Sequence, residues 1–227
     1  MKIEIIYSFQ NANKAKGLAV IIDVFRAFFT ACFVINNGAK IIIPVDDIDL
    51  AYNLKKENPD YVLMGERNDI VPDGFDFGNS PAEIERVDFF GKTVIHTTTQ
   101  GTQGIAKAVN AKEIITGSFV NAQAVIDYIK STKYQLVSLV CTDASTPENE
   151  DIVCAEYIKS HLKRRPLDFT EIKTHLINHP CASRFLNNTV GAVKRKDFDL
   201  CLALDRFNFI LKAEAQENNL IYLKRLK

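Results

Sequence analysis

The sequence predicts an α/β protein whose largely parallel sheet is covered by helices on both sides. Short apolar runs typical of buried strands alternate with segments of helical periodicity between residues 18 and 162. This alternation is typical of β–α–β units, in which each helix returns the chain to the next parallel strand. No stretch rich in Gly, Ser or Pro divides the 227 residues, so one compact unit over residues 1–227 is favoured over separate domains.

Three strands and two helices are predicted before the middle of the chain. The strands are the apolar runs 18–23, 40–45 and 61–65. The helix between the first two ends near Gly38, and its apolar stripe consists of Phe25, Phe28, Phe29, Cys32 and Phe33. The second helix follows Asp46 and Asp47, either of which can cap it.

The same order repeats in the next part of the chain. Strands are predicted at 93–97, 113–117 and 135–141, with a short helix at 101–110 between the first two. The following helices are indicated by two apolar faces: Asn121, Ala124, Val125, Tyr128 and Ile129, then Cys154, Ala155, Ile158 and Leu162. Beyond them we expect a helix at 168–179 and a hairpin made of 207–215 and 219–226.

Composition narrows the class of protein. Lys+Arg and Asp+Glu number 28 each, so no overall charge favours nucleic acid or an anionic membrane. No apolar run reaches 18 residues, and the N-terminal segment turns polar after Tyr7, unlike a secretory signal. Five widely spaced cysteines without a C-x-x-C pair predict thiols in a reducing cytoplasm.

Polar residues follow the predicted strands repeatedly. In a parallel sheet, ligands bind beyond the carboxyl ends of the strands. Residues suited to an anion or a hard cation occur at five such ends: Asp23 and Arg26; Glu66 and Arg67; Thr97, Thr98, Thr99, Gly101 and Thr102; Ser118 and Asn121; Glu150 and Asp151. We therefore expect them to converge on one cleft.

The segment TTTQGT at 97–102 is a candidate phosphate cradle. Threonine hydroxyls and backbone N–H groups before a helix bind phosphate without added charge. Arg26 and Arg67 would supply bidentate donors. Three β-branched residues also suit the end of a strand, so a purely structural role is the alternative.

Carboxylates beside such donors predict a bound cation. Asp23, Glu66, Glu150 and Asp151 would repel a phosphorylated substrate unless Mg²⁺, which takes oxygen ligands, lies between them. The simpler alternative for Asp23 is a helix cap, and for Glu150 and Asp151 a favourable first turn of a helix. His175 and His179 lack a third ligand for zinc and are read as a helix end.

Several common phosphate-handling motifs are absent. No cysteine is followed six residues later by arginine, and no G-x-x-x-x-G-K-[ST] segment occurs. The D-x-D at 47–49 lies at the start of a predicted helix and is interpreted as capping.

A set of motifs resembles the 2-phosphosulfolactate phosphatase family. The stretches occur in the family's order and spacing between about residues 18 and 155: IDVFRA (22–27), GERN (65–68), GFDFGNSP (74–81), TTTQGT (97–102), GSFVNA (117–122) and EDIVCA (150–155). GFDFGNSP and TTTQGT together are specific, whereas either alone is modest evidence. Weaker similarities follow at 183–186 and 197–205.

The resemblance implies a Mg²⁺-dependent hydrolase that removes phosphate from 2-phospho-3-sulfolactate, a step towards coenzyme M. It also implies a three-layer α/β/α fold with a mostly parallel or mixed sheet and partly duplicated β/α units, so two intertwined halves at 1–110 and 111–227 are an alternative division. GFDFGNSP, with Asn79, would form a wall of the cleft. The expected partner is a small phosphorylated acid substrate. A homo-oligomer is a further possibility that the sequence does not decide.

The sequence also departs from the family. Gln100 stands where the family usually has Asn, the loop at 142–150 lacks the usual Cys-Gly, and 181–188 lacks the His and Gly of an S-x-H-G-like stretch. These positions are expected to touch substrate or the rim of the site. The departures leave two alternatives open. One is a phosphatase for another small phosphorylated hydroxy acid, and the other is a non-catalytic metabolite-binding homologue.

Overall fold

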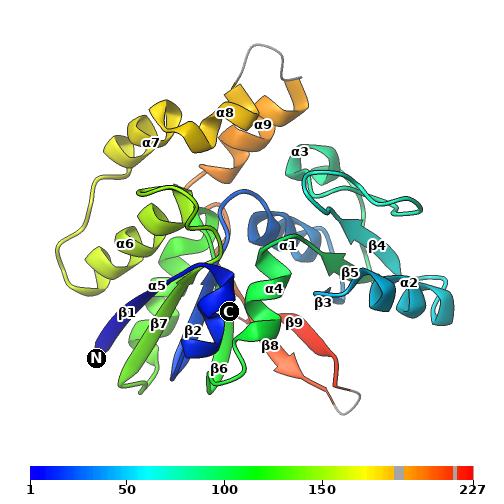
Figure 1. Ribbon diagram of the computed structural model, residues 1–227, viewed down its shortest axis with the longest axis horizontal. Coiled ribbons are helices and arrows are strands. Elements are labelled where there is room, and N and C mark those ends of the chain that lie inside the picture. The colour runs from blue at the N-terminus through cyan, green and yellow to red at the C-terminus, as the bar shows by residue number, and fades with distance from the viewer. Residues whose placement is uncertain (187–191, 217–218, 227) are drawn as a thin grey trace.

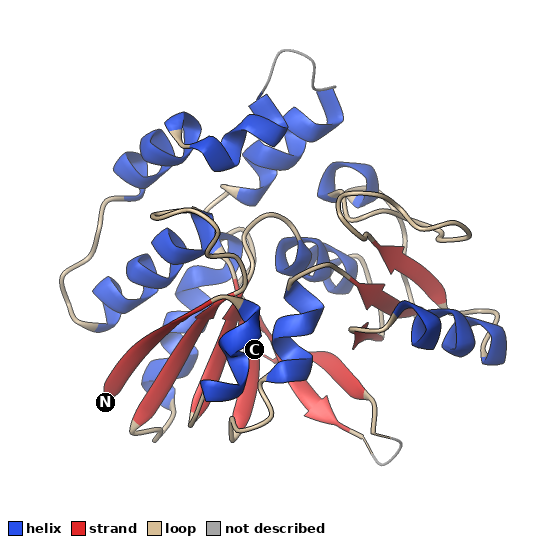
Figure 2. Cartoon of the chain, in the orientation of Figure 1, coloured by secondary structure: helices blue, strands red, loops and turns tan. Residues whose placement is uncertain are grey.

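The computed structural model describes residues 1–186, 192–216 and 219–226 and shows the predicted three-layer α/β/α architecture (Figures 1 and 2). The strands of the described residues are β1 (Lys2–Tyr7), β2 (Leu18–Ile22), β3 (Ile41–Val45), β4 (Val62–Gly65), β5 (Thr93–Thr97), β6 (Glu113–Gly117), β7 (Leu136–Cys141), β8 (Ile210–Ala215) and β9 (Ile221–Leu226). The helices are α1 (Ala27–Asn36), α2 (Ile48–Glu57), α3 (Pro81–Ile84), α4 (Gly101–Lys107), α5 (Ala122–Ser131), α6 (Glu150–Leu162), α7 (Phe169–Asn178), α8 (Ser183–Leu186) and α9 (Ala192–Cys201). Short 3-10 turns are η1 (Phe9–Lys14), η2 (Phe119–Asn121) and η3 (Pro180–Ala182).

One mixed sheet joins all nine described strands in the order β1-β7-β2-β6-β8-β9-β3-β5-β4. Two groups of parallel strands, β1-β7-β2-β6 and β3-β5-β4, flank the antiparallel hairpin β8–β9. The hairpin pairs antiparallel with β6 on one side and with β3 on the other. The predicted hairpin therefore exists, and it connects the two parallel groups instead of closing an edge.

The central strands carry the sequence pattern of buried parallel strands. Every residue of β2 is fully buried, because helices cover both faces of the sheet there. The edge strand β1 was not predicted from the sequence. Most of its residues are partly buried, and among the described strands it pairs with β7 alone, so it lacks the continuous apolar run of an inner strand.

Helices pack on both faces of the sheet. The helices α5 and α6 contact each other and the strands β8 and β7, and α4 with η1 lies against β2 on the other face (Figure 1). The helix α1 is buried from Ala27 to Ile35, so its apolar stripe widens to nearly the whole surface. None of the described helices is long and apolar enough to cross a membrane.

A helical cap lies over the carboxyl ends of β2 and β7. It consists of α7, α8 and α9, which Figure 1 shows above the sheet. The apolar residues Phe185 and Phe198 of the cap are buried and stack against Phe25, at ring-centroid distances of 4.9 and 5.3 Å. This packing places the cap beside the first residues after β2.

Two local predictions are settled by the structure. The side chain of Asp47 accepts the N–H of Asp49 at 3.0 Å, so the D-x-D segment caps α2. All five cysteines are free thiols, and Cys141 and Cys154 are buried, with burial raising the pKa of both well above the usual value.

Candidate active site

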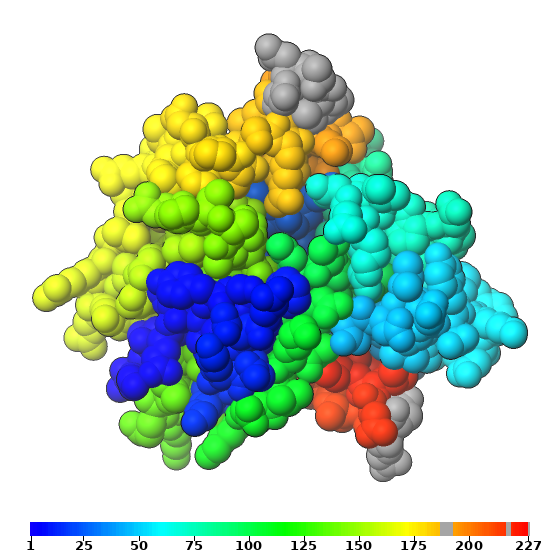
Figure 3. All heavy atoms as spheres, in the orientation of Figure 1, coloured from blue at the N-terminus to red at the C-terminus, as the bar shows by residue number. Residues whose placement is uncertain are grey.

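A cavity of about 120 Å³ opens where the carboxyl ends of the two parallel strand groups meet. Figure 3 shows a hollow at this place, bordered by the green segment after β7, the cyan segment after β4 and the gold residues of α8. Twelve residues line the cavity: Asp23, Phe25, Arg26, Glu66, Asn68, Asp69, Asn79, Thr98, Thr99, Gln100, Asp143 and Arg184.

Asp23 lies in the cavity lining directly after β2. Its Oδ1 accepts the N–H of Ala27 at 2.9 Å, and its Oδ2 lies 3.2 Å from Oγ1 of Thr142. The carboxyl is only 6% exposed, and burial raises the pKa of Asp23 to about 6. Asp23 thus holds the start of α1 and also presents an acid to the cavity.

Asp151 lies behind Asp23 and shares the same hydroxyl. Its Oδ1 accepts the N–H of Val24 at 2.8 Å, and its Oδ2 lies 3.0 Å from Oγ1 of Thr142 and 2.9 Å from the N–H of Asp143. Burial, followed by the charge of Asp23, raises the pKa of Asp151 well above its usual value. Because Thr142 has one hydroxyl proton, it donates to only one of the two carboxylates at a time.

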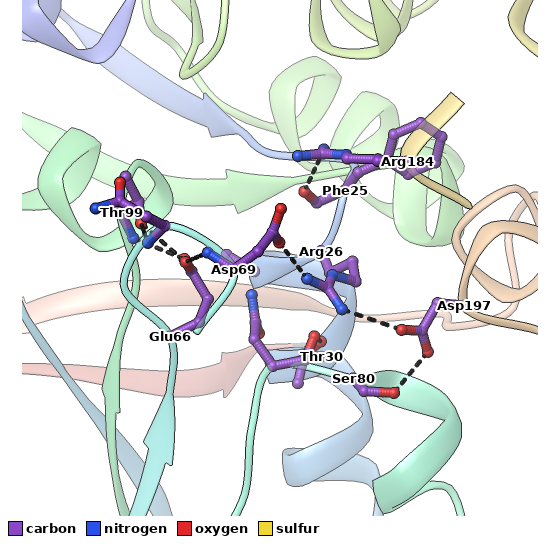
Figure 4. A network of polar contacts seen from close by, with 12 residues as sticks. Phe25, Arg26, Thr30, Glu66, Asp69, Ser80, Thr99, Arg184 and Asp197 are labelled. Atoms are coloured by element: carbon purple, nitrogen blue, oxygen red, sulfur yellow. Dashed lines mark hydrogen bonds and ion pairs between the residues drawn. The ribbon is translucent and has the colours of Figure 1, made fainter. Parts of the chain in front are cut away.

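Glu66 holds the loops after β4 and β5 together. Its Oε1 accepts the N–H of Thr99 at 2.8 Å, and its Oε2 accepts the Thr99 hydroxyl at 2.8 Å and the N–H of Asp69 at 2.9 Å. Asn68 and Asp69 have φ angles of 53° and 62°, a left-handed conformation that Asn and Asp tolerate better than most residues. Figure 4 shows Glu66 between Asp69 and Thr99.

Arg26 is fixed from two sides at the cavity (Figure 4). Its Nη2 contacts Oδ1 of Asp69 at 2.6 Å, and its Nη1 contacts Oδ2 of Asp197 at 3.2 Å. Asp197 comes from α9 and is fully buried, and its Oδ1 accepts the hydroxyl of Ser80 at 2.8 Å and the N–H of Ala82 at 2.9 Å. The cap therefore sets the position of Arg26 and of the GFDFGNSP segment together.

Asn79 presents an amide to the cavity. Its Oδ1 lies 3.2 Å from Nε2 of His96, which is buried in β5. Burial, followed by the charge of Arg67, lowers the pKa of His96 to about 4, so the imidazole is neutral at physiological pH. With a proton on Nε2, His96 donates to Asn79 and fixes that amide, which leaves the Nδ2 donors of Asn79 for a ligand.

Arg184 reaches the cavity from α8. Its Nη2 donates to the carbonyl of Phe25 at 3.0 Å and contacts Oε1 of Glu150 at 3.3 Å. Figure 4 shows the guanidinium beside Phe25. Glu150 is buried beneath it, and burial raises the pKa of that carboxyl against the opposing effect of Arg184.

The cavity lining is acidic on balance. Four carboxylates face two guanidinium groups there: Asp23, Glu66, Asp69 and Asp143 against Arg26 and Arg184. Oxygen donors of this kind fit Mg²⁺, which uses one or two carboxylates and keeps several waters. Within the described part of the chain, no three His, Cys, Asp or Glu side chains are close enough to hold an ion by themselves. The donor set therefore fits a Mg²⁺ ion completed by water and substrate oxygens.

A model of the 2-phosphosulpholactate phosphatase family matches residues 5–216. The chain belongs to this family. It is 45% identical over 146 residues to a probable 2-phosphosulfolactate phosphatase of Caldicellulosiruptor saccharolyticus, covering 61% of this chain and 60% of the relative. A protein with the same description from Thermoplasma acidophilum is 33% identical over 193 residues, covering 84% and 83%. A third from Clostridium perfringens is 36% identical over 180 residues, covering 76% and 73%.

Six of the predicted site residues of this member of the phosphosulfolactate phosphatase family line the cavity, five from the strand-end pattern and Asn79 from the GFDFGNSP motif. They are Asp23, Arg26, Glu66, Asn79, Thr98 and Thr99. Asp151 and Glu150 lie directly behind the lining, next to Asp23 and Arg184 respectively. The sequence pattern of polar strand ends thus leads to one cavity, although its residues are far apart along the chain.

Other predicted residues lie outside the cavity lining. Arg67 donates to the carbonyls of Glu66 and Asp46 and to the hydroxyl of Thr97, so its guanidinium ties loops together. Thr102 exchanges hydrogen bonds with Thr98 at the start of α4. Ser118 and Asn121 are almost fully buried. The side chain of Asn121 accepts the N–H of Ser118 and donates to the carbonyl of Phe209, just before β8.

Gly101 packs so closely against its neighbours that a side chain does not fit there. A Cβ on Gly101 would lie 2.8 Å from Oδ2 of Asp23 and 2.6 Å from Cβ of Ala27. The close approach is therefore to the acid of the lining and to α1, and Gly101 itself does not line the cavity.

Six lining residues were not among the site residues named individually from the sequence: Phe25, Asn68, Asp69, Gln100, Asp143 and Arg184. Three of them, Gln100, Asp143 and Arg184, lie in the stretches that depart from the family and that were expected to touch substrate or the site rim. Phe25 and Asn68 belong to the IDVFRA and GERN motifs and Asp69 directly follows GERN, so the strand-end rule applied more widely would have included them.

Proposed function

We propose that this protein is a Mg²⁺-dependent phosphatase that hydrolyses 2-phospho-3-sulfolactate to 3-sulfolactate and inorganic phosphate. The observation that carries the proposal is the acidic cavity that combines Asp23 and Glu66 with the guanidinium of Arg26 and the hydroxyl of Thr98. Family membership supports the substrate, since relatives that carry the name of this activity align with most of the chain.

The reaction requires water to attack phosphorus while the bond between phosphorus and the C2 oxygen breaks. The released C2 oxygen takes up a proton, and the phosphoryl group leaves as inorganic phosphate. Bound Mg²⁺ would supply charge neutralisation and polarise the phosphoryl group. Asp23 and Glu66 are the predicted ligands that face the cavity and would hold the ion, whereas Glu150 and Asp151 lie behind the lining.

The chain's own donors orient the phosphate. The hydroxyl oxygen of Thr98 accepts the N–H of Thr102 at 3.1 Å, so the hydroxyl proton remains for a ligand. The amide of Asn79 is oriented by His96, and Arg26 is held in place by Asp197. Donors that are fixed before the substrate arrives need no reorganisation during the reaction, which favours the transition state.

Protonation of Asp23 sets the lowest pH at which activity is expected. Its pKa is raised to about 6 by burial, so it is mostly neutral at pH 5 and mostly ionised at pH 7. Only the ionised form is a ligand for Mg²⁺ or an acceptor for a proton. Activity should therefore increase as pH rises through about 6.

The decisive experiment measures phosphate release from a panel of phosphorylated hydroxy acids, with Mg²⁺ and with EDTA. The proposal expects the highest kcat/KM on 2-phospho-3-sulfolactate and no turnover after chelation. Higher kcat/KM on another phosphorylated hydroxy acid would support the alternative substrate class. Binding of these compounds without turnover of any would support a metabolite-binding protein.

The pathway, the cellular location and the oligomeric state each need a separate measurement. A place in coenzyme M biosynthesis would require that removal of the gene lowers cellular coenzyme M. The reducing environment indicated by five free thiols supports a cytoplasmic location, which cell fractionation would test. A homo-oligomer would appear as a larger mass in light scattering of the purified protein.

A further inference from the structure

The two guanidinium groups of the cavity differ in how deeply they are buried and in how many of their nitrogens contact carboxylates. The side chain of Arg26 is 10% exposed, and both of its terminal nitrogens contact carboxylates, those of Asp69 and Asp197. The side chain of Arg184 is 40% exposed. Arg26 therefore lies deep in the cavity, whereas Arg184 lies at its rim.

The contacts of Arg184 orient its guanidinium but leave donors available. Its guanidinium carbon lies 5.0 Å from the ring centre of Phe185 and 5.9 Å from that of Phe25. Both of its hydrogen bonds to described residues leave from Nη2, towards the carbonyl of Phe25 and towards Glu150. Among the described residues no partner contacts Nη1 or Nε, so these nitrogens keep charged N–H donors for an acid group, although each two-donor edge of the guanidinium includes the occupied Nη2.

Glu150 holds Arg184 in place, a role that does not require a bound metal. Its side chain is 3% exposed, and its Oε2 has no hydrogen-bond partner among the described residues. A buried carboxylate of this kind needs a neighbouring cation, and Arg184 at 3.3 Å is the one that contacts it. Glu150 therefore anchors Arg184 through Nη2, and the donors of Nη1 are left for a ligand at the rim.

The chemistry of the proposed substrate places its acid groups at different depths. The phosphate is attached to C2 and must reach the deep donors Arg26 and Thr98. The sulfonate is attached to C3, one carbon further along the skeleton, and so extends towards the rim. We propose that Arg184 binds this sulfonate and selects for it, with Glu150 as its positioning residue. The inference rests on the proposed phosphatase function and assigns the specificity of the same cavity.

A matched pair of substrates tests the assignment. 2-Phospho-3-sulfolactate and 2-phospholactate differ only in the sulfonate. For Arg184→Gln we expect KM for the sulfonated substrate to rise about 10- to 100-fold with little change in kcat, the usual loss for one charge-assisted interaction. KM for 2-phospholactate should stay within about twofold, because that substrate does not reach Arg184. Equal losses on both substrates would overturn the assignment and place Arg184 at the phosphate or at the carboxylate, which the two substrates share.

Two further variants serve as controls. One tests whether losing any arginine has the same effect, and the other tests whether Glu150 positions Arg184 or binds metal. Arg206→Gln removes an arginine that pairs with Glu85 on the surface, and it should leave both substrates unaffected. Glu150→Gln should raise KM for the sulfonated substrate only, with an unchanged Mg²⁺ concentration for half-maximal activity. If Glu150→Gln lowered kcat on both substrates and raised the Mg²⁺ requirement, Glu150 would be a metal ligand and not the positioning residue.

Ligand binding keeps the inference testable if the phosphatase proposal fails. Titration calorimetry with 3-sulfolactate and with lactate does not depend on turnover. A wild-type protein that hydrolyses neither substrate would overturn the proposed function alone. Weaker binding of 3-sulfolactate by Arg184→Gln, with unchanged binding of lactate, would still support the sulfonate site. Equal binding of 3-sulfolactate by the wild type and by Arg184→Gln would refute it.

Discussion

At the scale of single residues, Asp23 shows how a functional group is kept at a cost in stability. It lies in the cavity lining, and its neighbour Asp151 competes for the single proton of Thr142. Ionising both acids without a cation leaves one of them without the hydroxyl donor, in surroundings where burial already disfavours charge. The pair is therefore most stable with a shared proton or with a cation nearby.

The replacement Asp23→Asn should make the metal-free protein more stable at neutral pH. The pKa of Asp23 is raised from 3.8 to about 6, so its contribution to stability is full below pH 3.8 and is lost as pH rises through about 6. A shift of about two units corresponds to roughly 3 kcal/mol at pH 7.5. In EDTA, we expect Asn at this position to raise the melting temperature at pH 7.5 but not at pH 4, and in Mg²⁺ we expect it to abolish turnover. Equal melting shifts at both pH values would show that the charge of Asp23 is not the cause.

Thr98 and Gly101 should respond differently to valine. Thr98→Val removes one hydroxyl, which should lower kcat/KM by roughly one to two factors of ten if the hydroxyl meets phosphate. Gly101→Val should reduce activity more, because a Cβ at this position would lie 2.8 Å from Oδ2 of Asp23 and would displace that carboxyl. Thr93→Val, at the start of the same strand β5, is the matched control and should keep wild-type kinetics. Normal phosphate inhibition of both test variants would remove this loop from the site.

At the scale of secondary-structure elements, the β–α order could be predicted because buried strands and amphipathic helices leave periodic apolar patterns. The strand β1 and the helices α3, α8 and α9 could not be predicted in this way. Two of these helices have only four residues, and β1 is a partly exposed edge strand. The same limit applies to the site. Strand-end acids such as Asp23 and Glu66 were predictable. Arg184 and Asp197 lie in the weaker family similarities at 183–186 and 197–205, but only packing of the cap brings Arg184 to the cavity and Asp197 to Arg26.

The helix α9 should matter to catalysis through Asp197, which does not line the cavity. Replacing this residue by Asn leaves the buried guanidinium of Arg26 with a weaker partner and disturbs the bonds to Ser80 and Ala82. Loss of one member of a buried pair typically costs about 3–5 kcal/mol, and we expect a fall of this order in the free energy of unfolding, together with a lower kcat. Urea unfolding and steady-state kinetics would measure both.

Asp199→Asn provides the control on the same helix. Asp199 is exposed, and a surface change of this kind is usually worth less than about 0.5 kcal/mol. If Asp197→Asn were as stable and as active as Asp199→Asn, the cap would not position Arg26.

At the scale of the whole molecule, the hairpin β8–β9 makes the cavity possible. It joins the two parallel strand groups, and each group contributes part of the lining: Asp23 and Asp143 follow strands of one group, whereas Glu66 and Thr99 follow strands of the other. Strands in a sheet are rotated relative to their neighbours, so the two groups do not lie in one plane. Their carboxyl ends meet at a common space, as Figure 1 shows.

Leu223 of β9 tests whether the chain unfolds as the single unit that its sequence predicts. Its side chain is fully buried, and it pairs with Ile42 of β3 on one side and with Ala213 of β8 on the other. Leu223→Ala should lower the free energy of unfolding by about 2–5 kcal/mol, the usual range for a buried leucine. Leu226→Ala, at the exposed end of the same strand, should cost much less, since its side chain keeps 37% of its surface in solvent. For one cooperative unit, fluorescence and circular dichroism should give the same single transition in both variants. Two separate transitions in Leu223→Ala would instead favour two halves that fold independently and that the hairpin merely joins.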